Sequence, residues 1–166
     1  MTLVVEDGTG KTNAESYASV AQADTRLAAL GMTVWASNTT TTEREQALRR
    51  ATAFMEQAFR TDWVGARLLR DQALSWPRYG AEADGFVLDS ISVPTDIVNA
   101  CIDLAFKAAS GDLNADLTRA VLREKVGPIE TEYAPNSPQA TRYVSIEMAL
   151  RPYLRGSRVM ARLVRS

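Results

Sequence analysis

One segment of the sequence carries residue types that could bind a nucleotide. Residues 8–12 read Gly-Thr-Gly-Lys-Thr, follow a short apolar segment and precede a predicted helix. A phosphate-binding P-loop needs the pattern Gly-x-x-x-x-Gly-Lys-Ser/Thr, because its backbone amides wrap the phosphates. Val5 occupies the position of the first glycine, and no apolar strand ending in aspartate follows to hold magnesium. A turn followed by a helix cap explains the same residues, so we predict no nucleotide site.

The residue sets of the commonest catalytic sites are missing from the sequence. Without histidine, the chain cannot form a Ser-His-Asp or Cys-His arrangement or a histidine metal site. Cys101 is the only cysteine, which excludes a thiolate zinc site and an intramolecular disulfide. Acid–base chemistry would need paired carboxylates, and the candidate pairs are Glu6/Asp7, Glu43/Glu45 and Glu130/Glu132. Nothing groups these acids with a second functional group, so we predict no enzyme, no cofactor and no metal.

Large aromatic residues near arginines could stack the bases of single-stranded DNA. The candidates for such a DNA contact are Trp63, Arg67, Trp76 and Arg78. The alternative is packing in the core or between subunits, because large aromatic side chains mostly serve burial. The sequence favours packing and leaves DNA contact open.

The charged residues are unevenly distributed along the chain. Residues 142–166 carry six arginines and one acid, whereas residues 1–141 carry 13 basic and 19 acidic groups. The last residues fit a strand or a helix equally well and are too few to form either alone. We predict an arm over 157–166 that is ordered by a partner, with a frayed terminus as the alternative. Its contact candidates are Arg158, Val159, Met160, Arg162, Leu163 and Arg165.

Hydrophobic spacing predicts four helices. The first spans about 12–31 and the second about 42–60, and each would begin with a threonine–glutamate capping box. These boxes are Thr12 with Glu15 and Thr42 with Glu45. The third helix begins at Pro94 and ends at Gly111. Its inner face consists of Ile97, Cys101, Leu104, Ala105 and Ala108.

The remaining segments are predicted to be less regular. The helical pattern breaks over 66–85, where residues 72–78 form a proline-bounded turn, and 86–93 is irregular or briefly extended. Residues 121–133 contain two β-prone stretches around Gly127-Pro128 and could form a hairpin. A fourth helix follows over 139–151, interrupted by Pro152.

These elements predict a mainly α fold: a small bundle of about four helices with a short β-hairpin and an extended C-terminal arm. A length of 166 residues suits one domain, which we place at 1–156, with the arm at 157–166. No apolar run reaches the roughly 18 residues of a membrane helix, and the N-terminus lacks a signal-peptide pattern. We therefore expect synthesis on the cytoplasmic side and no membrane contact.

Short motifs along nearly the whole chain resemble a phage and prophage protein family. They include residues 5–10, 15–17, 23–24, 47–48, 51–52, 63–65, 72–78, 93–94, 125–127, 132–133 and 150–154. The most distinctive is Gln-Ala-Leu-Ser-Trp-Pro-Arg at 72–78. Members of this family are similar to head–tail adaptor, or head-completion, proteins, and some are labelled DnaT-like single-stranded-DNA-binding proteins.

The adaptor resemblance implies a structural virion protein in the neck, made in the host cytoplasm. It implies a ring of twelve copies under the portal, with the C-terminal arm on the portal protein and a stopper or tail-completion protein on the far side. Double-stranded DNA would pass through the ring without sequence readout. The second label implies the alternative function, a single-stranded-DNA-binding replication accessory protein that uses the tryptophan and arginine candidates.

Overall fold

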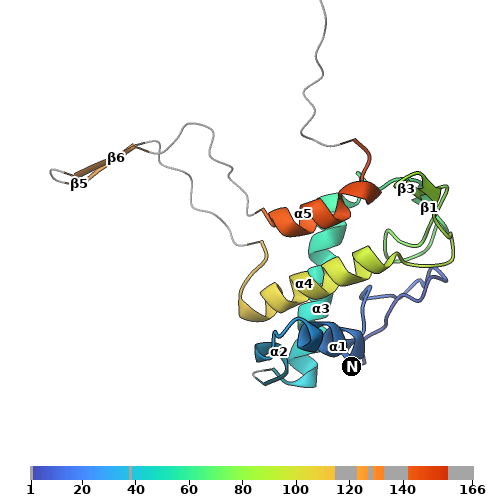
Figure 1. Ribbon diagram of the computed structural model, residues 1–166, viewed down its shortest axis with the longest axis horizontal. Coiled ribbons are helices and arrows are strands. Elements are labelled where there is room, and N and C mark those ends of the chain that lie inside the picture. The colour runs from blue at the N-terminus through green and yellow to red at the C-terminus, as the bar shows by residue number, and fades with distance from the viewer. Residues whose placement is uncertain (1, 38, 115–122, 127–128, 133–141, 157–166) are drawn as a thin grey trace, which may run out of the picture.

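The computed structural model describes residues 2–37, 39–114, 123–126, 129–132 and 142–156. Within these residues the protein is mainly helical, as predicted, with three short antiparallel strand pairs (Figure 1). The α-helices are α1 (Val20–Ala29), α2 (Val34–Ser37), α3 (Thr41–Phe59), α4 (Thr95–Ser110) and α5 (Val144–Leu150), and a 3₁₀ helix η1 (Arg151–Tyr153) follows α5.

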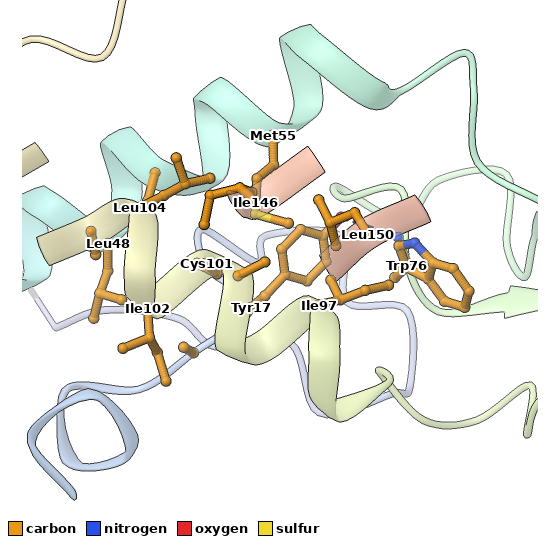
Figure 2. Packing of buried hydrophobic residues seen from close by; sticks show 14 of the residues in the cluster. Tyr17, Leu48, Met55, Trp76, Ile97, Cys101, Ile102, Leu104, Ile146 and Leu150 are labelled. Carbon is orange, nitrogen blue, oxygen red and sulfur yellow. Dashed lines mark hydrogen bonds between the residues drawn. The ribbon is translucent and has the colours of Figure 1, made fainter. Parts of the chain in front are cut away.

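The hydrophobic core lies between α3, α4 and α5, with α1 packed against α3 and α4. The predicted inner face of α4 is confirmed, since Ile97, Cys101, Leu104, Ala105 and Ala108 are all buried. Figure 2 shows side chains from the three helices and from Tyr17 pointing toward one another. Each Å² of apolar surface that is buried contributes about 25 cal/mol, so the packing of these side chains is the main source of the fold's stability.

Both predicted capping boxes were misplaced. The observed box of α1 is Ser19 with Gln22, and the box of α3 is Thr40 with Glu43, two residues before the predicted one. Glu15, the predicted partner of Thr12, accepts instead from the Val4 amide at 3.1 Å. The segment before α1 is held extended by a bridge between Val5 and Ser16, which leaves no room for a helix there. Pairing with a distant segment therefore moved the start of the first helix from about residue 12, as predicted, to Val20.

Two small hairpins occupy the region where the helical pattern breaks. Strand β1 (Ala66–Arg67) pairs with β2 (Arg78–Tyr79), and β3 (Glu82–Ala83) pairs with β4 (Phe86–Val87). These four strands, residues 66–87, are called the hairpin end below. The predicted hairpin around residues 127–128 is confirmed as β5 (Arg123–Val126) and β6 (Ile129–Glu132). Figure 1 shows β1 and β3 together beside the carboxyl end of α5.

After α5, residues 153–156, called the C-terminal segment below, lie against the residues just before β1. Leu154 forms a bridge with Trp63, and the Val64 amide donates to the Tyr153 carbonyl at 3.0 Å. The fourth helix, predicted over 139–151, spans Val144–Leu150 as α5. Residues 139–141 of the predicted range lie outside the described residues. The predicted arm over 157–166 also lies outside them. No helix in the described part of the chain is long and apolar enough to cross a membrane.

Candidate functional site

The glycine-rich loop at residues 8–11 wraps a carboxylate of the chain itself. The amides of Gly8 and Gly10 donate to Glu6 Oε1, and the amide of Lys11 donates to Glu6 Oε2, each at 2.9 Å. Glu6 is only 4% exposed. Successive amides of this kind form an anion-binding nest, and in a P-loop they would hold phosphate. Here the Glu6 carboxylate occupies the nest. From the sequence, Glu6 was considered only as a member of a carboxylate pair, and this role was not predicted.

The other residues of this loop have structural contacts as well. Gly8 has a φ of 100°, and a Cβ there would lie 2.0 Å from the Ile91 carbonyl oxygen, so only glycine fits. Lys11 Nζ donates to the Val5 carbonyl at 2.8 Å and pairs with Asp7 at 2.9 Å. The lysine is therefore engaged by the loop that it belongs to.

Two of the predicted DNA-contact residues, Trp63 and Trp76, are fully buried. Their rings meet edge to face with centroids 5.9 Å apart, and Trp76 meets Tyr153 in the same way at 6.1 Å. A base cannot stack on a ring that has no exposed face, so this burial excludes the alternative of DNA contact by the two tryptophans and agrees with the packing that the sequence favoured. They join the hairpin end to the C-terminal segment by aromatic packing.

Arg78, another predicted contact, is also directed inward and is 6% exposed. Its Nε donates to the Val64 carbonyl at 2.6 Å, Nη1 to Ser75 at 3.1 Å and Nη2 to Gly65 at 2.9 Å. Arg78 thus ties the chain around 64–65 to the 72–78 segment. Its direct contact with DNA is excluded by this burial.

The distinctive 72–78 segment is held in shape by its own polar side chains. Gln72 Oε1 accepts from the Leu69 amide at 2.7 Å, and Gln72 Nε2 donates to the Leu74 and Pro77 carbonyls at 2.8 and 3.0 Å. The hydroxyl of Tyr17 donates to Glu56 on α3 and accepts from the amide of Ser75 at 3.0 Å. Burial, together with the Glu56 charge, raises the pKa of Tyr17, so its hydroxyl remains a donor. This motif therefore specifies a loop conformation.

Three arginines come together at the turn around Gly65. Arg78 and Arg155 both donate from Nη2 to the Gly65 carbonyl, and Arg67 is the cross-strand partner of Arg78. Arg67 is partly buried and donates from Nη2 to the Gln72 carbonyl. Burial first, and then the charge of Arg155, lowers the pKa of Arg78. Among the described residues, no carboxylate lies within ion-pair distance of these three guanidinium groups.

Exposed aromatic rings lie elsewhere on the hairpin end. Tyr79 is 56% exposed and Phe86 is 74% exposed, with Val87 and Ile91 exposed nearby in the sequence. Successive side chains of a strand point to opposite faces, so the inward direction of Arg78 turns Tyr79 outward. Neither ring is among the four DNA-contact candidates selected from the sequence, because an alternation of only two residues is too short to show which side chain faces outward. These two rings are the available stacking surfaces of the hairpin end.

In the described residues no three His, Cys, Asp or Glu side chains are grouped so that they could hold a metal ion. Cys101 is buried beside Thr52, whose Oγ1 is 3.3 Å from the sulfur, and burial raises the pKa of the thiol. A thiol of this kind is a poor nucleophile. The lack of enzymatic activity stays a prediction.

Comparison with protein families gives a match over the entire chain. The family described as "Putative DnaT-like ssDNA binding protein" matches residues 1–166. No curated protein and no solved structure matches the chain significantly.

This match corrects the expectation of a head–tail adaptor. The matching family is described by binding to single-stranded DNA, which agrees with the alternative function, and nothing in it supports a virion neck, a connector or a portal-bound ring. The sequence motifs were shared with a family whose members carry two labels, and motif likeness alone could not choose between them. The portal-binding role of Arg158, Val159, Met160, Arg162, Leu163 and Arg165 depended on the adaptor label and loses its basis, and these residues lie outside the described ones.

Proposed function

The chain belongs to the family of DnaT-like ssDNA-binding proteins, and from this premise we propose that it binds single-stranded DNA as a replication accessory protein, through its hairpin end. The observation that carries the proposal is the family match over all 166 residues. The place of binding follows from the exposed side chains, because a protein that binds single strands without sequence preference needs aromatic rings for the bases and cations for the backbone.

The hairpin end offers both kinds of group. Tyr79 and Phe86 present exposed rings, and every base has a face that can stack on such a ring. Arg70, in the turn after β1, and Arg155, beside Gly65, are exposed cations in the same region. This combination supports contact with several nucleotides.

The acidic residues of the protein limit where the phosphate backbone of a bound DNA strand can lie. The chain has a net charge of −1, and Glu82 and Asp84 are exposed in the second hairpin. These carboxylates would repel phosphates, so we place the DNA backbone on the side of β1 and β2. With few cations against the strand, binding should be modest, and the affinity should fall only gradually as salt is added, because each phosphate contact contributes a slope of about −0.7 to log K against log salt.

Fluorescence anisotropy of a labelled oligothymidine at 50 and 200 mM salt tests this function. We expect binding at the lower salt concentration, weaker binding of a duplex of equal length, and a loss of affinity in Tyr79→Ala. Stacking of one base contributes about 1–3 kcal/mol, which is roughly a 5- to 150-fold change in Kd. Val144→Ala is a suitable control because Val144 is 59% exposed at the amino end of α5, the end farther from β1 and β3 (Figure 1).

Two outcomes would contradict different parts of the proposal. Absence of oligothymidine binding at 50 mM salt would refute the function. Normal binding by both Tyr79→Ala and Phe86→Ala would retain the function and refute the placement of the interface at the hairpin end.

A further inference from the structure

The arginines around Gly65 have an arrangement that an ordinary packing role does not require. Arg78 Nη2 lies 2.9 Å from the Gly65 carbonyl oxygen, and Arg155 donates to the same oxygen. Gly65 has a φ of 68°, and a Cβ at this position would lie 2.6 Å from the Tyr79 carbonyl oxygen, so the turn packs directly on β2. The close fit brings guanidinium groups from residues 67, 78 and 155 to one place.

Like charges held together repel one another, and in the part of the chain that the structure describes no ion pair joins these three guanidinium groups to a carboxylate. The nearby carboxylate of Glu56 is bonded to the Tyr17 hydroxyl and, at 2.7 Å, to the Ser75 hydroxyl. The carboxylate of Asp62 accepts from the Thr61 hydroxyl at 3.0 Å. The pKa of Arg78 is lowered by burial first and then by the positive charge of Arg155, and the Glu56 charge offsets only part of this effect. An anion placed here would relieve the repulsion.

The three arginines differ in what they can offer an anion. Arg78 is buried and uses three of its N–H groups on carbonyls. Arg67 is partly buried, and its Nε is enclosed without a hydrogen-bond partner. Arg155 is exposed and uses one of its five side-chain N–H groups, on Gly65. Arg155 is therefore the residue that can contact a ligand, and the other two add positive charge behind it.

The backbone of Arg155 is fixed in place, which makes the site preorganised. Its amide donates to the Asp62 carbonyl at 2.5 Å, and the preceding Leu154 forms a bridge with Trp63. A guanidinium on a fixed backbone loses less freedom on binding than one on a free terminus.

We propose that Arg155, backed by Arg67 and Arg78 at the Gly65 turn, binds one phosphate group. Guanidinium suits phosphate oxygens because its N–H groups form a planar fork that can make two parallel hydrogen bonds. The phosphate comes from a nucleic acid strand, as a terminal monoester or an internal phosphodiester, and the source rests on the proposed function.

Binding of inorganic phosphate tests the site without DNA. In the full-length protein labelled with ¹⁵N, titration with phosphate should shift the Arg155 Nε–H and Gly65 amide resonances. Arg155→Ala should abolish the Gly65 shift and leave the unfolding temperature unchanged. Arg142→Ala is the matched control, because Arg142 is an exposed arginine paired with Glu147 at the other end of α5. Absence of any phosphate-dependent shift at Gly65 in the wild type would overturn the proposal.

Oligonucleotide binding identifies the source of the phosphate. Arg155→Ala should reduce the steepness of log K against log salt by about 0.7, the value for one phosphate contact in a single strand. A gain in affinity from a 5′-phosphate that disappears in Arg155→Ala identifies a terminal monoester, and a changed slope without this gain identifies a phosphodiester. An unchanged slope and an unchanged response to the 5′-phosphate would overturn the assignment to a nucleic acid. Phosphate binding without oligonucleotide binding would refute the proposed function and retain the phosphate site.

Discussion

Replacement of Glu6 by glutamine tests whether the glycine-rich loop is built around this carboxylate. The substitution keeps the size and shape of the side chain but removes its charge. The oxygen in the Oε1 position can still accept from the Gly8 and Gly10 amides, but as a neutral acceptor. The new NH₂ group occupies the Oε2 position and faces the Lys11 amide, so two donors meet where a hydrogen bond was.

The expected loss of stability follows from these three bonds. Hydrogen bonds to a charged group contribute about 1.5–3 kcal/mol each, against about 0.5–1.5 kcal/mol for neutral pairs. Weakening two bonds by about 1 kcal/mol each and losing the third gives a decrease of about 3–5 kcal/mol in the free energy of unfolding. For a domain of this length, about 1 kcal/mol corresponds to roughly 2–4 °C in Tm, so Tm should fall by roughly 6–20 °C.

Urea unfolding measures this change, with tryptophan fluorescence as the signal, since Trp35, Trp63 and Trp76 are all buried. Asp7→Asn is the matched control, because Asp7 is the neighbouring carboxylate and is exposed. It should lower stability much less than Glu6→Gln does at neutral pH. A decrease below about 1 kcal/mol for Glu6→Gln would refute the idea that Glu6 organises the loop.

Two further predictions concern Arg78 and Asp7. Arg78→Ala should lower the free energy of unfolding by about 3–5 kcal/mol, because three hydrogen bonds from a buried guanidinium are lost. Arg70→Ala is the control, because Arg70 is exposed, and urea unfolding should show that it lowers the free energy of unfolding by less than about 0.5 kcal/mol. Equal losses for Arg78→Ala and Arg70→Ala would argue against the structural role of Arg78. Hydrogen bonds from Thr9 and Lys11 lower the pKa of Asp7 from 3.8 to about 2. Its contribution to stability is complete above 3.8 and is lost as pH falls toward 2, so acid unfolding of Asp7→Asn should depend less on pH in that window than acid unfolding of the wild type.

The long helices could be predicted from the sequence because their signal is local. The spacing of apolar residues in α4 and the proline before it determine its start, and its inner face is buried as predicted. A helix buries one stripe whatever it packs against, so periodicity alone indicates which residues face inward. The hairpin around residues 127–128 was found for a similar reason, since β-prone stretches flank a turn.

The candidate site could not be predicted in the same way. Tryptophan beside arginine is compatible with a DNA surface and with a core, and only the packing of Trp76 between Trp63 and Tyr153 shows that these rings are internal. In β2 the inward residue is the charged Arg78 and the outward residue is the aromatic Tyr79, the reverse of the usual pattern. Carbonyl groups of the neighbouring turn make this reversal favourable, and they belong to residues more than ten positions away.

The sequence by itself determined the helical class, the lack of histidine chemistry and the inner face of α4. It also excluded a complete P-loop, because that depends on residue types at fixed spacing. Only the tertiary structure decided that Glu6 fills the glycine nest, that Ser19 and not Thr12 caps α1, and that Arg155 reaches Gly65 from 90 positions away. The physical reason is the range of the interactions. Helical periodicity arises between residues three or four positions apart, whereas burial of a charge or a ring depends on partners that meet only after the chain has folded.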